Sequence, residues 1–143
     1  MKIAIASDHA GVDYKARLIS YLEYNGFEVM DLGPVTEDSV DYPDYGHKVA
    51  EAVTENRVDF GILFCGSGNG INMSANKHQA VRSALCWKKE IAELARLHND
   101  ANVLTMPARF ITYEESQEIT ALFLATDFEG GRHAKRVNKI ACC

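Results

Sequence analysis

Apolar residues along this chain follow two alternating patterns. In one pattern they stand next to each other in short runs, which is typical of strands buried on both faces of a parallel sheet. In the other they recur every three or four residues, which predicts helices with one buried side. The runs predict five strands, over 2–7, 27–32, 58–64, 81–85 and 102–106. The helical pattern covers 11–25, 44–56, 71–77, 88–98, 114–125 and 132–141.

This alternation predicts an α/β fold of the doubly wound, Rossmann or flavodoxin-like kind. The sheet would hold five parallel strands and carry helices on both faces. A length of 143 residues suits a single domain with its own core, so we expect one domain over 1–143.

Composition and charge argue against several functional classes. The net charge of −5 does not suit nucleic-acid binding, which normally needs a basic face. No apolar run approaches the roughly 20 residues of a membrane-spanning helix. The chain enters its first strand at once, without the apolar segment of a secretory signal, so we expect a cytoplasmic location. The four cysteines lack paired CxxC motifs, which argues against a structural zinc site.

In the most informative stretch, Cys65 stands at the end of a predicted buried strand. The glycine-rich turn Gly66–Gly70 follows at once, and a helix begins directly after it. Backbone N–H groups and the positive end of that helix would hold an anion and enlarge the thiolate fraction of Cys65. The GxGxG spacing fits neither a dinucleotide fingerprint nor a Walker loop. A turn made only for tight packing and a buried, inert thiol are the plain alternatives.

In doubly wound sheets, ligands bind at the carboxyl ends of the strands. Several polar residues come after predicted strands and should therefore gather at that edge. They are Asp8, His9, Tyr42, Cys65 and Arg109.

His98 ends the helix predicted over 88–98, so it should lie at the opposite, amino-terminal edge of the sheet. A helix of about ten residues is roughly 15 Å long. If His98 and Cys65 act on one substrate, His98 must come from a neighbouring chain, and the enzyme is at least a dimer. A core histidine is the ordinary alternative for His98, and we expect His47 and His78 to be structural.

Arg132 and Arg136 are four residues apart on the last predicted helix and share one side of it. Together with Arg109 and His9 they would form an anion clamp, because a guanidinium grips phosphate with two parallel hydrogen bonds. The alternative is an ordinary solvated helix face.

Six motifs, in this order along the chain, resemble the B-type ribose-5-phosphate isomerases. That family also holds the galactose-6-phosphate isomerase subunits and allose-6-phosphate isomerase. The motifs are Ser7-Asp8-His9-Ala10-Gly11, Asp41-Tyr42-Pro43, Cys65-Gly66-Ser67-Gly68-Asn69-Gly70, Ala75-Asn76-Lys77, Arg96-Leu97-His98-Asn99-Asp100 and Glu129-Gly130-Gly131-Arg132-His133.

The resemblance implies an isomerase of the pentose phosphate pathway that interconverts D-ribose 5-phosphate and D-ribulose 5-phosphate through a cis-enediolate. It implies no cofactor and no metal. It also implies a homodimer, paired into tetramers in some members, with active sites between subunits and the helix 132–141 at the dimer interface.

The resemblance further assigns roles to individual residues. Cys65 would be the base that moves the proton between C1 and C2, with Ser67 assisting at the substrate oxygens. His98 would open the furanose ring, helped by Asp8. The remaining contacts would be the loop amides of Gly66, Gly68, Asn69 and Gly70 on the enediolate, Tyr42 and Asn99 on sugar hydroxyls, and His9, Arg109, Arg132 and Arg136 on the phosphate.

Two other functions stay open at this point. Some relatives place a glutamate in the loop instead of the cysteine, whereas this chain keeps Cys65 and has no acid there. One extra carbon in a substrate is worth only about 1–3 kcal/mol, so an allose-6-phosphate or galactose-6-phosphate isomerase is an alternative. The other alternative is a non-catalytic, flavodoxin-like binding or redox-sensing module that uses Cys65 as a sensor thiol.

Overall fold

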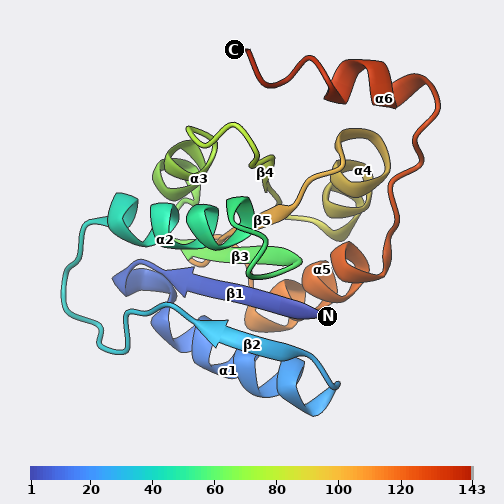
Figure 1. The fold of residues 1–143 in the computed structure, drawn as a ribbon. Helices are drawn as coiled ribbons and strands as arrows, with labels where there is room; N and C mark the ends of the chain where they lie inside the picture. Colours follow the sequence, from blue (N-terminus) through green and yellow to red (C-terminus); the bar gives the residue numbers. More distant parts are fainter. Residues whose placement is uncertain (143) are drawn as a thin grey trace.

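The computed structural model describes residues 1–142, and Cys143 lies outside the described residues. Its centre is a sheet of five parallel strands in the order β2-β1-β3-β5-β4 (Figure 1). This arrangement confirms the predicted doubly wound α/β fold. The strands are β1 (Lys2–Ser7), β2 (Glu28–Asp31), β3 (Phe60–Cys65), β4 (Ser83–Leu85) and β5 (Val103–Pro107).

Helices cover both faces of the sheet. The helices are α1 (Val12–Tyr24), preceded by the 3-10 turn η1 (His9–Gly11), α2 (Tyr42–Thr54), α3 (Asn69–Ala75), α4 (Lys89–Asn99), α5 (Tyr113–Ala125) and α6 (Arg132–Val137). On one face, residues of α1, α4 and α5 pack with Ile3, Ile62 and Leu104 of the strands. On the other face, residues of α2 and α3 pack with Ala4 and Leu63.

The strand order changes direction between β1 and β3. From β1 the chain moves outward to β2, and it then returns to the other side of β1 to form β3. The ends of these two strands therefore define the switch point at which doubly wound proteins bind ligands. Ser7 pairs with Phe64 in the register of β1 and β3, so the residues that follow both strands emerge side by side.

Among the boundaries that differ from the prediction are the start of α2 and the end of α6. The helix predicted from residue 44 begins at Tyr42, with Pro43 in its first turn. A proline there stabilises the helix start, because its fixed φ angle is already helical and its missing N–H is not needed. The last helix was expected over 132–141, but α6 ends at Val137. Beyond it, Lys139 N–H and Ile140 N–H bond to carbonyls three residues back, which tightens the chain out of α geometry.

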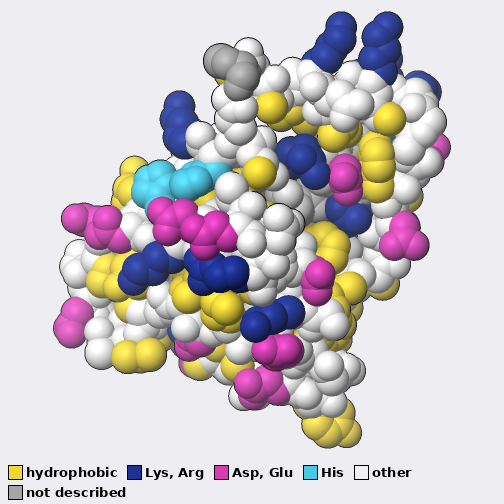
Figure 2. Space-filling model, viewed as in Figure 1, with side chains coloured by type: hydrophobic (Ala, Val, Ile, Leu, Met, Phe, Trp, Pro, Cys, Tyr) yellow, Lys and Arg dark blue, Asp and Glu magenta, His cyan; other side chains and the backbone are white. Residues whose placement is uncertain are grey.

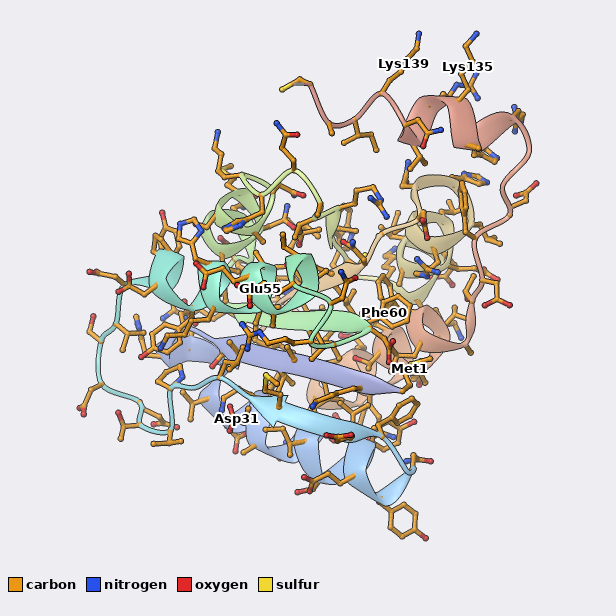
Figure 3. All side chains as sticks on the ribbon, in the orientation of Figure 1. Met1, Asp31, Glu55, Phe60, Lys135 and Lys139 are labelled. Carbon is orange, nitrogen blue, oxygen red and sulfur yellow. The ribbon has the colours of Figure 1, made fainter. Side chains whose placement is uncertain are left out.

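The helix α6 packs against α4, and the Glu129 N–H donates to the Leu97 carbonyl at 3.1 Å. Figure 3 shows Lys135 and Lys139 pointing away from the rest of the chain at this end. Across residues 1–142, no helix combines the length and the apolar character needed to cross a bilayer.

The core also contains Cys86, which is fully buried. Burial raises the pKa of its thiol from 9.0 to about 12. The pKa of this thiol is therefore higher in the folded chain than in the unfolded chain. The contribution of the protonated thiol to folding stability is complete below about pH 9 and is lost as pH rises towards 12.

We therefore expect alkaline pH to destabilise the wild type more than Cys86→Ala. Between about pH 7 and about pH 10, the difference in unfolding free energy between the two proteins should change by roughly 1.4 kcal/mol. Urea unfolding at both pH values measures this. A difference that is constant with pH would contradict the assigned ionisation of Cys86.

Candidate active site

The ends of β1 and β3 bring a carboxylate and a thiol into contact. The Cys65 Sγ–H donates to Asp8 Oδ2 at 3.2 Å, and the Gly66 N–H reaches the same oxygen at 3.3 Å. The other oxygen, Asp8 Oδ1, accepts from the Ala10 N–H at 2.9 Å, which begins the turn η1. Asp8 and Cys65 are 7% and 6% exposed, so this pair is largely shielded from water.

The ionisation of Cys65 differs from the sequence prediction. Burial raises the pKa of the thiol, and the hydrogen bond and charge of Asp8 raise it further. The backbone N–H groups of Gly68 and Ile71 act in the predicted direction and lower it, but burial and Asp8 outweigh them. The prediction of an enlarged thiolate fraction is therefore wrong for the chain by itself, because the pattern of glycines did not reveal the neighbouring carboxylate.

The glycine loop needs its glycines at the positions that touch other elements. Gly68 has a φ of +81°, in the region that favours glycine, and a Cβ there would lie 2.4 Å from Leu85 Cδ1. The exposed Ser67 hydroxyl accepts from the Asn69 N–H at 3.3 Å and from the Asn69 side chain at 3.4 Å. These contacts hold the loop in one shape and leave its polar side chains open to solvent.

Two exposed side chains lie directly against this loop. A Cβ on Gly70 would lie 2.5 Å from the Tyr42 ring, and one on Gly66 would lie 3.1 Å from an Arg109 guanidinium nitrogen. His9 is half-buried, and its Nδ1 has no hydrogen-bond partner among the described residues. The structure therefore brings the predicted carboxyl-edge residues together around Cys65.

His98 and Asn99 lie at the opposite edge of the sheet, as the sequence predicted. The helix α4 starts beyond the carboxyl end of β4 and ends before the amino end of β5. In Figure 1, α4 and α6 lie on the right, whereas the arrowhead of β1 points to the left. Cys65 pairs with Pro107, the last residue of β5, and a five-residue strand spans about 13 Å.

A buried arginine fixes the end of α4. Arg96 donates to the Asp100 carboxylate at 2.9 Å, to the Ala101 carbonyl at 2.6 Å and to the Thr126 carbonyl at 3.0 Å. Its guanidinium also lies over the ring of Phe60 at 5.0 Å. This network holds His98 in place at the amino-terminal edge, so a shift of His98 towards Cys65 within one chain would break it.

His98 has a neighbour that the sequence did not reveal. The His133 ring stacks on it at 4.2 Å with an interplanar angle of 15°, and Glu129 Oε2 lies 3.9 Å from His98 Nε2. His133 is buried, and burial, followed by the charge of His98, lowers the pKa of its imidazole. The only sequence signal was the spacing of four between Glu129 and His133.

The three residues His98, Glu129 and His133 also form a group of metal-type ligands. An ion bound by two imidazoles lies in the plane of both rings, where the nitrogen lone pairs point. Stacked rings direct their lone pairs side by side, so they do not converge on one ion. We therefore assign this group no metal role.

The predicted anion clamp is split in a single chain. His9 and Arg109 lie at the carboxyl edge, whereas Arg132 and Arg136 are exposed on α6, which packs on α4. His47 and His78, which we expected to be structural, share a hydrogen bond of 2.8 Å. His47 belongs to α2 and His78 follows α3, so the bond joins these two parts of the fold. Figure 2 shows a histidine patch over α2 and α3.

Comparison with known proteins identifies the family. A family model described as Ribose/Galactose Isomerase matches residues 3–140. The chain belongs to this family.

Individual members of the ribose/galactose isomerase family are similar over nearly the whole chain. Ribose-5-phosphate isomerase B of Escherichia coli K12 is 41% identical, covering 97% of this chain and 93% of its own. A crystal structure of the Thermotoga maritima ribose 5-phosphate isomerase superposes with a TM-score of 0.96 at 48% identity, covering 98% and 97% of the two chains. The Mycoplasma genitalium ribose-5-phosphate isomerase B with bound ribulose-5-phosphate superposes at 0.94 and is 44% identical, covering 98% and 93%.

Proposed function

We propose that this protein interconverts D-ribose 5-phosphate and D-ribulose 5-phosphate. The observation that carries the proposal is the Cys65 thiol at the switch point of the sheet, beside an open glycine loop. An aldose–ketose isomerisation needs a base at the carbon that loses its proton and donors for the enediolate oxygens. Cys65 and the Gly66–Gly70 amides meet these two needs from one segment of chain.

The reaction would proceed through a cis-enediolate. Cys65 removes the proton from C2 of the open-chain aldose, and the loop amides, with Ser67, stabilise the negative charge that develops on the oxygen at C1. The proton then returns to C1 while the proton of the C2 hydroxyl moves to the oxygen on C1, which gives the ketose. His98 would open the furanose ring beforehand, because an imidazole exchanges protons near neutral pH. None of these steps calls on a metal or cofactor.

The working enzyme would be a homodimer with two shared sites. His98 and Asn99 are fixed at one edge of the sheet and Cys65 at the other, so one chain cannot apply both groups to one sugar. A second copy would supply His98, Asn99 and the α6 arginines to the loop of the first, which places α6 at the interface of two single-domain chains. Exposed Trp87 and Phe110 line a hollow of about 300 Å³ beside Ser67 and are available for such a contact.

The same dimer would complete the phosphate site. His9 and Arg109 stand beside the loop, and Arg132 and Arg136 would arrive from the partner. The buried His9 Nδ1, which has no hydrogen-bond partner within residues 1–142, supports a further polar contact at this point. Tyr42, which lies on Gly70, would contact a sugar hydroxyl. We expect the enzyme to act in the cytoplasm.

The alternatives differ in how well the site supports them. A redox sensor needs an accessible thiolate, whereas Cys65 is buried with a raised pKa. The six-carbon sugar phosphates are the nearer rivals, since the family model also covers galactose isomerases. Assays on ribose 5-phosphate, allose 6-phosphate and galactose 6-phosphate, each with a chelator present, would decide between them. Activity only on a six-carbon substrate would overturn the pentose assignment.

For the base, we expect Cys65→Ala to lower kcat on ribose 5-phosphate by about 10²–10⁴, the usual worth of a general base. The fold should survive, because the change removes one sulfur atom at the edge of the core. Cys142→Ala, at an exposed cysteine, is the matched control and should keep full activity. A near-normal kcat in Cys65→Ala would remove Cys65 from the mechanism.

For the phosphate site, we expect Arg136→Ala mainly to raise KM, because the phosphate lies away from the reacting carbons and supplies binding energy. Steady-state kinetics with Lys139→Ala, which also removes an exposed cation at this end of the chain, provide the control. An unchanged KM with a collapsed kcat would reverse the assignment of Arg136.

A further inference from the structure

We propose that Asp8 and Cys65 work as one proton-sharing pair, in which Asp8 accepts the thiol proton while Sγ acts on the substrate carbon. This inference rests on the proposed isomerase function and deepens it. It gives Asp8 a role at the enolisation step, in addition to the help with ring opening that the family resemblance implied.

The geometry places Sγ between an acceptor and donors. On one side it donates to Asp8 Oδ2 at 3.2 Å. The backbone N–H groups of Gly68 and Ile71 act on it from α3 and the loop, and they favour the thiolate. A proton that moves from Sγ to Oδ2 therefore leaves behind a thiolate that already has hydrogen-bond donors. The O–H formed on Asp8 remains directed at the sulfur.

The surroundings favour sharing over simple ionisation. Asp8 forms no ion pair within residues 1–142, and its hydrogen-bond donors are Cys65 and the backbone N–H groups of Ala10 and Gly66. Three charged or titratable side chains adjoin the pair or its loop. His9 follows Asp8 in sequence, Arg109 lies against Gly66, and Tyr42 lies against Gly70. An ionised carboxylate and a thiolate at this distance in a shielded site would repel strongly. One proton between them avoids that repulsion.

Each step then balances. The S–H bond of Cys65 breaks as an O–H bond forms on Asp8. The thiolate takes the proton from C2, the C–H electron pair becomes the C1–C2 double bond, and the carbonyl electrons move to the oxygen on C1. The pair passes from one negative charge to none while the sugar gains one, so the site never carries an extra charge. A proton then moves from the oxygen on C2 to the oxygen on C1. Next, the Sγ–H group protonates C1, and C2 becomes the carbonyl carbon of the ketose. Asp8 then returns its proton to sulfur.

A thiol that shares its proton need not lose it to solvent, so catalysis and thiol ionisation should have different pH profiles. The experiment uses ribulose 5-phosphate as substrate, because this ketose has no free hydroxyl placed to close a furanose ring and so bypasses ring opening. In the wild type, kcat should be flat from about pH 6 to about pH 8. Alkylation of Cys65 by iodoacetamide, followed by mass spectrometry of its peptide, should rise only above the ordinary thiol pKa of 9.0.

In Asp8→Asn, the carboxylate that raises the pKa of Cys65 is gone. Cys65 should therefore alkylate at lower pH than in the wild type, yet kcat should fall about 10²-fold and rise with pH in step with alkylation. Asp13→Asn, at an exposed acid on α1, is the matched control and should change neither profile. Circular dichroism checks that each variant is folded.

Three results would contradict the proposal that Asp8 and Cys65 share a proton during catalysis. One is a wild-type kcat that rises with pH together with alkylation, a test that needs no folded Asp8 variant. Another is that Asp8→Asn keeps the wild-type kcat, with no dependence of kcat on pH. The last is that Asp8→Asn has a low kcat while Cys65 is still alkylated with the wild-type pH profile, which would indicate a purely structural role for Asp8. If the wild type fails to isomerise the pentose phosphates, the proposed function fails, while the alkylation comparison still tests whether Asp8 governs the Cys65 proton.

Discussion

Parallel strands begin at one edge of a sheet and end at the other, and the whole arrangement of this protein depends on that constraint. Because β1 and β3 are neighbours, Asp8 and Cys65 leave the sheet at the same point and meet within hydrogen-bond distance. Arg109 follows β5 and reaches the same loop. By the same constraint, a helix that connects two parallel strands ends at the far edge, which is where α4 places His98.

The two edges differ in their electrostatics. At the carboxyl edge, burial and the Asp8 carboxylate raise the pKa of the Cys65 thiol, whereas the backbone N–H groups of Gly68 and Ile71 lower it. At the amino edge, the buried His133, whose pKa burial lowers, stacks on His98, and Glu129 lies near both rings. A pair of thiol and carboxylate and a pair of stacked imidazoles thus lie at separate edges of the sheet. In the proposed dimer they would meet across the interface.

Much of the fold followed from the sequence. Runs of apolar residues predicted each of the five strands, because a strand buried on both faces must be apolar throughout. The start of α2 and the end of α6 did not follow from the apolar pattern. The pattern does not show that Pro43 allows α2 to begin at Tyr42, or that the chain tightens after Val137. The sequence also placed the residues at the correct edges, since that depends only on which element each one follows.

The pairing of side chains within the site did not follow from the sequence. The contact between Asp8 and Cys65 requires β1 beside β3, and the apolar pattern does not specify strand order. The stacking of His133 on His98 depends on the path of residues 126–131, which carry no regular pattern. The hydrogen bond from Arg96 at the end of α4 to the Thr126 carbonyl likewise joins two segments that lie 30 residues apart in the sequence.

Mixing two inactive variants tests most directly whether the two edges cooperate between chains. If the protein forms the proposed dimer, the Cys65→Ala and His98→Ala variants should each be nearly inactive. After the two are unfolded together and refolded in equal amounts, half the dimers are mixed and each holds one intact site. About a quarter of the wild-type activity should therefore return, as expected for a two-fold symmetric dimer. Activity that stays at the level of the separate variants, although mixed dimers have formed, would contradict a site shared between chains.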